Sequence, residues 1–469
     1  MRKPYPKYKP TPIIWLSQVP EHWNIFRFKS LLKSETNGVW GDDPKGDEND
    51  ILCLRVADFD RDFEVLSQEN NTVRNVSPRD YENRKLMDGD LLIEKSGGGE
   101  LLPIGRVGIY SWEEKRAVCS NFMARLKPQL RYTNTRFLFY LFKASYVFRL
   151  NLLAIKQTTG IQNLDTANFF NLKISVPPLP EQTQIAKFLD YKCALIDTAI
   201  QKKTRLIELL KEQKQAIINR AVTRGLNPDA PMKDSGIEWL GKIPEHWKVT
   251  KFRRIINKIE QGWSPFCEGR EADVEEWGIM KVGCVNQIEF NPLENKALPK
   301  NLKPKEDYEL HKGDLLMSRA NTKELLGSIS VVGDIRPKLM LCDKLYRIHT
   351  ISDIDKEFLV FLLRALPSRR QIEEFATGAS SSMQNISQAK ILRLWLALPN
   401  TDEQIEIRNF IKNESKGIDV TISRIEQEIE LIKEYKTALI AEAVTGKIDV
   451  REWKPKSKIT NQVENVANL

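Results

Sequence analysis

The chain has 469 residues, and its 72 basic and 63 acidic side chains leave a formal net charge of +9 with a pI near 9.0. At about 150 residues per domain, this length predicts several folded units. The basic excess favours a polyanionic partner. With 41% hydrophobic and 29% charged residues, the composition is that of an ordinary globular protein, which excludes disordered and fibrous proteins.

Neither membrane insertion nor metal binding finds support in the sequence. The longest apolar run, Phe137–Phe142, is far shorter than the roughly 20 residues that cross a bilayer. The N-terminal segment lacks the apolar stretch of a secretory signal, so we expect a cytoplasmic protein without a membrane contact. The six cysteines form no CxxC pair and no zinc-ligand pattern, and we expect them to be buried and reduced.

An internal repeat organises the chain. The block Val19–Trp23, with the sequence VPEHW, returns as Ile243–Trp247, with the sequence IPEHW. At the same offset, Asp88–Leu92 returns as Lys312–Leu316. Each copy fills roughly half of the chain, which indicates a two-copy duplication rather than a solenoid with repeats of about 20–50 residues.

The two copies differ in one loop and in their middle segments. From Ile104 and its counterpart Leu326 onward the offset is two residues shorter, so the second copy lacks two residues of a loop between Leu92 and Ile104. Residues 40–80 and 262–308 show no common register, although the flanking segments match. This pattern indicates one shared architecture that carries two different specificities.

Each copy begins with a mixed part. Short apolar runs such as 90–93 and 107–110 are bounded by Gly, Pro or Asp, as strands are. Residues 134–149 and their counterpart 355–370 carry Phe and Leu at helical spacing. We therefore expect about 150 residues of α+β structure in each copy.

A long helical pattern follows each α+β part, after prolines at 177–180 and at 399. Seam positions recur in alternating steps of four and three, as in a coiled coil. They are Ile185, Leu189, Lys192, Ile196, Ala199, Lys203, Leu206, Leu210, Gln213 and Ile217 in the first copy, and Ile407, Ile411, Glu414, Ile418, Thr421, Ile425, Glu428, Ile432, Tyr435 and Leu439 in the second. Lysines interrupt one seam and glutamates the other, which favours pairing of the unlike helices. The alternative is a long amphipathic helix that lies on its own domain.

Motifs of catalysis and cofactor binding are missing. The sequence has no GxGxxG fingerprint, no GxSxG elbow, no Asn-Pro-Pro-aromatic tetrapeptide of amino-methyltransferases and no compact nuclease pattern. His22 and His246 have no partners at metal-ligand spacing, and we expect them in a domain-entry turn with a packed Trp. We expect no catalytic residue, no metal site and no cofactor in this chain.

Two polar loops in each copy carry side chains suited to nucleic acid. The loop that changes length has a basic residue at the same place in both copies, Lys95 and Arg319. Arg and Lys reach phosphates or a guanine edge, Asn and Gln bond adenine, and Gly allows close backbone approach. The candidate DNA-contacting residues are Lys95, Ser96, Gly97, Gln157, Thr158, Thr159 and Gln162 in the first copy, and Arg319, Asn321, Ser380, Ser381 and Gln384 in the second. For any one of them, a solvated turn is the simpler interpretation.

The order of these motifs resembles the specificity subunit of type I restriction-modification systems. Each copy opens with (Val/Ile)-Pro-Glu-His-Trp, passes a Gly-Asp-Leu-Leu strand and enters its long helix through Pro-Leu-Pro-Glu-Gln or Thr-Asp-Glu-Gln. The resemblance covers residues 12 to about 447. It implies an α+β fold with a pseudo-two-fold duplication, in which two similar target-recognition domains are separated by two long helices that form an antiparallel coiled coil. The implied segments are an N-terminal segment 1–18, target-recognition domain 1 at 19–178, long helix 1 at 179–223, a linker at 224–242, target-recognition domain 2 at 243–398, long helix 2 at 399–446, and a polar, loosely ordered C-terminal tail at 447–469.

The resemblance also implies a non-catalytic subunit that recognises a bipartite, asymmetric site in double-stranded DNA. Its implied partners are two adenine-N6 methyltransferase (modification) subunits and an ATP-dependent restriction and translocation subunit. S-adenosylmethionine, ATP and Mg²⁺ are expected in those partners. Two other classes stay open: a coiled-coil scaffold without a DNA role, which a gel shift with genomic DNA would distinguish, and a fused methyltransferase or nuclease component, which a methylation assay on the isolated chain would distinguish.

Overall fold

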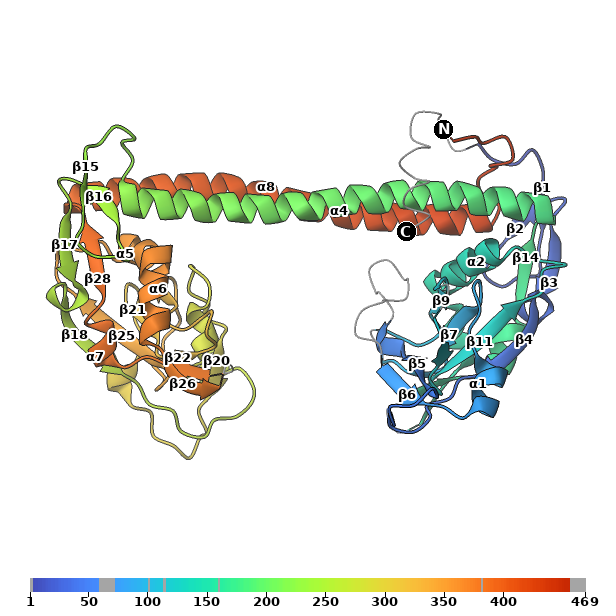
Figure 1. Ribbon diagram of the computed structural model, residues 1–469, viewed down its shortest axis with the longest axis horizontal. Coiled ribbons are helices and arrows are strands. Elements are labelled where there is room, and N and C mark those ends of the chain that lie inside the picture. The colour runs from blue at the N-terminus through green and yellow to red at the C-terminus, as the bar shows by residue number, and fades with distance from the viewer. Residues whose placement is uncertain are drawn as a thin grey trace. The chain divides into compact units, whose positions relative to one another are not determined.

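The computed structural model describes residues 3–58, 72–99, 102–112, 115–158, 161–380 and 383–455. The chain divides into two compact units (Figure 1). The first unit consists of Met1–Thr204 together with Glu426–Leu469, and the second consists of Arg205–Ile425. Each unit therefore combines one α+β part with a portion of both long helices.

Antiparallel strands dominate the first unit. Its strands are β1 (Tyr8–Pro10), β2 (Gln18–Pro20), β3 (Asn24–Arg27), β4 (Leu32–Asn37), β5 (Asp50–Leu54), β6 (Thr72–Asn75), β7 (Leu91–Glu94), β8 (Ser96–Gly97), β9 (Val107–Ile109), β10 (Ala117–Cys119), β11 (Met123–Pro128), β12 (Ile155–Thr158), β13 (Ile161–Leu164) and β14 (Lys173–Val176). Its helices are α1 (Pro78–Arg84), α2 (Thr135–Val147), α3 (Thr166–Asn171) and the 3-10 helices η1 (Phe28–Leu31), η2 (Val56–Asp58) and η3 (Leu150–Ala154). The largest sheet has the order β4-β11-β7-β9.

The second unit has its own set of strands and helices. Its strands are β15 (Met232–Asp234), β16 (Lys242–Pro244), β17 (Lys248–Lys251), β18 (Ile256–Gln261), β19 (Gly278–Met280), β20 (Asn295–Ala297), β21 (Leu315–Ser318), β22 (Ala320–Asn321), β23 (Ile329–Val331), β24 (Leu339–Met340), β25 (Leu345–Thr350), β26 (Thr377–Ser380), β27 (Met383–Asn385) and β28 (Trp395–Leu398). Its helices are α5 (Lys356–Arg364), α6 (Leu366–Phe375), α7 (Gln388–Ile391) and the 3-10 helices η4 (Phe252–Arg254), η5 (Val282–Val285) and η6 (Glu306–Tyr308).

Each sheet of the second unit repeats the strand order of a sheet in the first. The largest, β18-β25-β21-β23, matches β4-β11-β7-β9, and the sheet β20-β19-β24 matches β6-β5-β10. In the latter pair, the central strand pairs antiparallel with one neighbour and parallel with the other in both units. These strands include the middle segments whose sequences share no register. A glycine precedes the matched sheets: a Cβ on Gly38 would lie 2.1 Å from the Ser120 carbonyl oxygen, and one on Gly262 would lie 2.0 Å from the Leu341 carbonyl oxygen.

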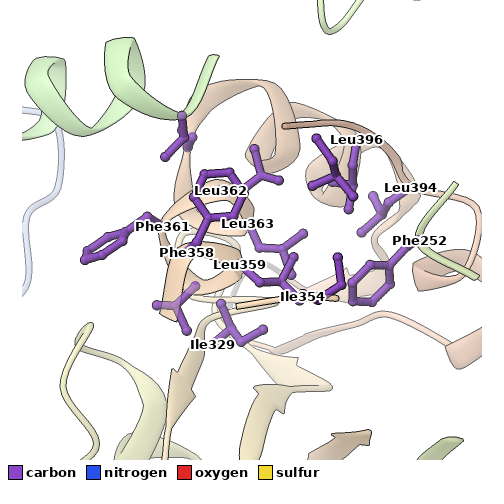
Figure 2. Close-up of a cluster of buried hydrophobic side chains, with 14 of the residues drawn as sticks. Phe252, Ile329, Ile354, Phe358, Leu359, Phe361, Leu362, Leu363, Leu394 and Leu396 are labelled. Atoms are coloured by element: carbon purple, nitrogen blue, oxygen red, sulfur yellow. The ribbon is translucent and has the colours of Figure 1, made fainter. Parts of the chain in front are cut away.

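Buried side chains of α5 form the centre of the core of the second unit (Figure 2). Phe358 and Leu363 are fully buried there. Asp355 caps the helix by accepting a hydrogen bond from the Phe358 amide at 2.8 Å, and Asn134 caps α2 in the same way through the Phe137 amide at 3.0 Å. Such caps contribute about 1 kcal/mol each and fix where the core helix begins.

The long helices α4 (Leu179–Arg224) and α8 (Thr401–Val444) run antiparallel in each unit (Figure 1). In the first unit, Lys436 Nζ lies 2.6 Å from Asp197 Oδ1, and Lys203 forms an ion pair with Glu428. In the second unit, Lys214 Nζ lies 2.6 Å from Asp419 Oδ2. Successive residues of α4 thus meet successively earlier residues of α8. The pairing of the two unlike helices agrees with the sequence prediction. Lys203 and Glu428, two seam residues of opposite charge, form one of the ion pairs between the helices.

The predicted seam of the long helices is wrong in phase over part of both helices. In α8, Ile422 and Ile429 are buried in place of the predicted Thr421 and Glu428. Ile207 is 9% exposed, whereas the predicted seam residue Leu206 is 44% exposed. The shift arises because buried positions advance by four residues twice in succession, at Ile185, Leu189 and Cys193. An α-helix has 3.6 residues per turn, so an extra four-residue step returns the seam to the partner without added supercoiling.

Residues 447–455, the described part of the tail, pack against the first unit, whereas the sequence predicts a loosely ordered tail. The Trp453 ring lies 5.2 Å from the Phe188 ring, edge to face. The Gln184 amide donates hydrogen bonds to two backbone carbonyls of the tail. Ile448 and Val450 are buried as well, so apolar side chains dock this segment on the first unit. Residues 456–469 lie outside the described part of the chain.

Candidate nucleic-acid interface

A polar cluster joins the Pro-Glu-His-Trp block of each unit to the first turn of a long helix. In the first unit, Trp23 Nε1 donates to Glu181 Oε1 at 2.9 Å, and His22 Nε2 lies 2.7 Å from Glu181 Oε2. The matching contacts in the second unit are those of Trp247 and His246 with Glu403, at 3.1 and 2.8 Å. Both Trp side chains are fully buried. The block is therefore a packed domain-entry turn, as the sequence predicts.

The next residue of each long helix fixes the same junction from the other side. Gln182 Oε1 accepts a hydrogen bond at 2.9 Å from the backbone amide of Asn134, the residue that caps α2. Gln404 Oε1 accepts from the Asp355 amide at 3.0 Å in the same way. The repeated Glu-Gln dipeptide thus orients the α+β part on its helix, because Glu181 and both glutamines are buried and Glu403, although half-buried, keeps the same hydrogen bonds.

The two predicted polar loops come together in each unit as one small sheet, here called the polar sheet. In the first unit its order is β12-β13-β8, with Gly97 of β8 opposite Gln162 of β13. In the second unit its order is β26-β27-β22, with Asn321 opposite Gln384. The segments are strands rather than loops, because β12 with β13 and β26 with β27 pair locally, and β8 and β22 each add a partner that is distant in sequence.

The predicted site residues take different places on the polar sheets. Gln157, Thr158 and Ser380 lie on the outer strands β12 and β26, whereas Thr159 and Ser381 lie outside the described residues. Gln384 is half-buried on the central strand β27.

Two of the predicted residues are engaged inside the protein. Gln162 is 5% exposed, and its Oε1 accepts a hydrogen bond from the Ile104 amide at 3.3 Å. Asn321 is 8% exposed, and its Nδ2 donates to Asn286 Oδ1 at 2.9 Å. In this conformation these two side chains support the polar sheets and do not face a ligand.

Lys95 stands at the edge of the first polar sheet, next to a carboxylate. Its Nζ contacts Asn37 Oδ1 and lies 3.6 Å from Glu35 Oε1, and 22% of its side chain is exposed. The neighbouring Ser96 Oγ lies 2.8 Å from Asn163 Oδ1 on β13. The positive charge is therefore accessible but partly compensated.

Arg319 occupies the same position on the second polar sheet in different surroundings. Its Nη1 donates to the Asp343 backbone carbonyl at 3.3 Å. Ile259 and Gln261 stand where the first unit has Glu35 and Asn37. The carboxylate beside Lys95 thus has no counterpart beside Arg319.

A turn that sequence reasoning missed lies directly beside each basic residue. The Lys95 amide donates to the Phe122 carbonyl at 2.8 Å, and the Arg319 amide donates to the Lys344 carbonyl at 2.8 Å. Phe122 is 48% exposed, and Lys344 is exposed as well. The available signal was the repeat itself, since both turns occupy matched positions but differ in their side chains.

Five of the six cysteines are buried, and Cys267 is half-buried. Burial raises the pKa of the Cys53 thiol to about 11 and that of the Cys342 thiol to about 12. Both thiols are therefore protonated and unreactive at neutral pH. Both side chains lie in buried hydrophobic clusters of their units.

The chain belongs to the family of type I restriction-modification DNA specificity domains. The family model matches residues 20–211 and, a second time, residues 244–431. The two matches fall on the two copies of the repeat. Membership gives the chain a DNA-recognition role within a type I restriction-modification system.

Relatives and solved structures agree with this membership. The chain is 30% identical over 225 residues to the type I restriction enzyme EcoEI specificity subunit of Escherichia coli, and the match covers 48% of this chain and only 38% of that relative. It is 28% identical over 347 residues to the MjaVIII specificity subunit of Methanocaldococcus jannaschii, covering 72% of this chain and 76% of the relative. A chain solved in work on complex assembly and conformational transition of a type I R-M system has a similar fold, with a TM-score of 0.64 at 14% identity, covering 92% of this chain and 99% of the other.

Within the described ranges, the structure contains no helix with the length and apolar character of a membrane span.

Proposed function

We propose that this chain is the DNA-recognition subunit of a type I restriction-modification complex, and that each unit recognises one half of a bipartite, asymmetric site in double-stranded DNA. The observation that carries the proposal is the pair of polar sheets, which share strand order and a basic position but differ in the side chains around it. A shared scaffold meets both half-sites in comparable poses, while different side chains select different bases.

In this proposal, residues of the polar sheets and of the segments beside them contact DNA. They are Lys95, Ser96, Gly97, Gln157, Thr158 and Thr159 for one half-site, and Arg319, Ser380, Ser381 and Gln384 for the other. Gln162 and Asn321 hold these segments in place from within the protein. The two long helices fix the length of the spacer between the half-sites.

The partners follow from the role of a recognition subunit that supplies no catalytic group. Two adenine-N6 methyltransferase subunits would carry S-adenosylmethionine, and a restriction and translocation subunit would carry ATP and Mg²⁺. The chain itself would bind none of these cofactors. Its contribution is to place the methyltransferases on the DNA.

The test is a double substitution, Lys95→Ala with Arg319→Ala, in the complex with the methyltransferase subunits. We expect weaker DNA binding and a salt dependence that falls by about 0.9 per lost phosphate contact. The matched control is Lys29→Ala with Arg253→Ala, because these exposed basic residues occupy equivalent positions in η1 and η4.

The outcomes separate the proposal from its alternatives. Unchanged affinity and salt slope in the double variant, or equal losses in the control, would contradict the proposed contacts. A wild-type complex that binds no DNA would favour a scaffold, and methylation by the isolated chain would favour a fused enzyme. Long-read methylation profiling with and without this gene should show a bipartite site only when the gene is present.

A further inference from the structure

The turn after β10 and its counterpart after β24 share one backbone geometry. The Met123 amide donates to the Ser120 carbonyl at 2.9 Å, and the Leu345 amide donates to the Cys342 carbonyl at 3.2 Å. Gly38 packs against the first turn and Gly262 against the second, so closely that neither residue could carry a Cβ atom. Each turn also accepts the amide of the basic residue on its polar sheet. The position of the turn is therefore fixed in both units.

The side chains that these two fixed turns present differ in kind. The first unit presents the aromatic ring of Phe122, which is 48% exposed. The second unit presents the ammonium group of Lys344 at the same place. Phe contacts a thymine methyl group in the major groove, whereas Lys donates to the acceptors of guanine. The two groups thus favour different base pairs.

The geometry points to Phe122 and Lys344 as specificity-determining residues, one for each half-site. Phe122 makes an apolar contact with a thymine methyl group in the half-site of the first unit. Lys344 donates to a guanine edge in the half-site of the second unit. The inference rests on the proposed function, and it adds the residues that make the two halves of the site differ.

The experiment exchanges the two side chains in separate variants, Phe122→Lys and Lys344→Phe, each assembled with the methyltransferase subunits. Methylation profiling on mixed genomic DNA gives the bases accepted at every position. We expect Phe122→Lys to change base preference by at least about fivefold within one half-site only, which is the smallest effect of one base contact. Lys344→Phe should change the opposite half-site only.

A matched control places the same new charge on the same unit, away from the turn. Leu130 is 66% exposed and follows the far end of β11, whose six residues span roughly 20 Å at about 3.3 Å per strand residue. Leu130→Lys should leave both half-sites unchanged. A second variant, Phe122→Leu, keeps an apolar side chain and should keep the same half-site.

The outcomes distinguish a failure of this inference from a failure of the proposed function. A bipartite wild-type site that stays unchanged in Phe122→Lys and in Lys344→Phe overturns this inference alone. A wild-type complex without a bipartite site overturns the proposed function. If Phe122→Lys abolishes methylation, an active Phe122→Leu with an unchanged site supports the inference, whereas loss in both variants shows a purely structural role and contradicts it.

Discussion

Lys95 and Arg319 hold the same position on the two polar sheets, and their neighbours set how strongly each attracts DNA. Glu35 lies 3.6 Å from the Lys95 ammonium group, whereas Ile259 takes that position in the second unit. A carboxylate at the interface repels phosphate and weakens the local positive potential. We therefore expect the second unit to depend more on its basic residue than the first.

Glu35→Gln should raise the affinity of the complex for its DNA site up to about fivefold at low salt, because removing an exposed ion-pair partner is worth about 0.2–1 kcal/mol. A binding titration by fluorescence anisotropy measures the change. The control is Asp88→Asn, since Asp88 is exposed before the opposite end of β7. An affinity that rises equally in both variants would indicate net charge alone and contradict the local account.

Glu181 and Glu403 make the same junction with different numbers of donors. Tyr5 also donates to Glu181, at 2.6 Å, in the first unit. Burial and the hydrogen bond to Glu181 raise the pKa of Tyr5 well above its usual range, so it stays a neutral donor. Glu181→Ala should cost about 2–4 kcal/mol and Glu403→Ala about half as much, because each buried donor left unpaired costs about 1–3 kcal/mol. Thermal unfolding of the two variants compares these losses, and a larger loss in Glu403→Ala would contradict the assignment.

At the level of the elements, the phase of the seam between α4 and α8 has a direct consequence for stability. Ile207→Ala should destabilise the protein by about 2–4 kcal/mol, as expected for a truncated buried side chain. Leu206→Ala, one residue earlier, should cost well under half of that, because Leu206 is 44% exposed. Urea unfolding measures both variants. Equal losses of stability in the two variants would contradict the shifted seam and favour the strictly alternating one.

Much of the architecture could be predicted from the repeat, and the rest depended on contacts that are distant in sequence. The VPEHW and IPEHW blocks and the Glu-Gln dipeptides marked real junctions, because their side chains bond to each other. The polar sheets looked like loops, since Ser96 and Gly97 form too short a strand to show alternation. The sheet of β5, β6 and β10 could not be predicted from the repeat, because the matching sheet of the second unit has the same hydrogen-bond pattern but a different sequence. The Phe122 turn was missed because an exposed aromatic next to a basic loop becomes visible only through a backbone contact.

At the level of the whole molecule, the length of the long helices should determine the spacing of the half-sites. α4 has 46 residues, which at 1.5 Å each corresponds to about 70 Å. Both α4 and α8 contribute residues to both units. Because ion pairs join the two helices in each unit, a change in length must be made in both helices together.

The most direct measurement is methylation profiling of a variant with 22 extra helical residues in each long helix, inserted between Thr204 and Arg205 and between Ile425 and Glu426. Two 11-residue repeats preserve the facing surfaces of the helices and add about 33 Å, close to the roughly 34–36 Å of one DNA turn. We expect both half-sites to stay unchanged while the spacer grows by about ten base pairs. An unchanged spacer with full methylation, or an altered half-site sequence, would contradict the account.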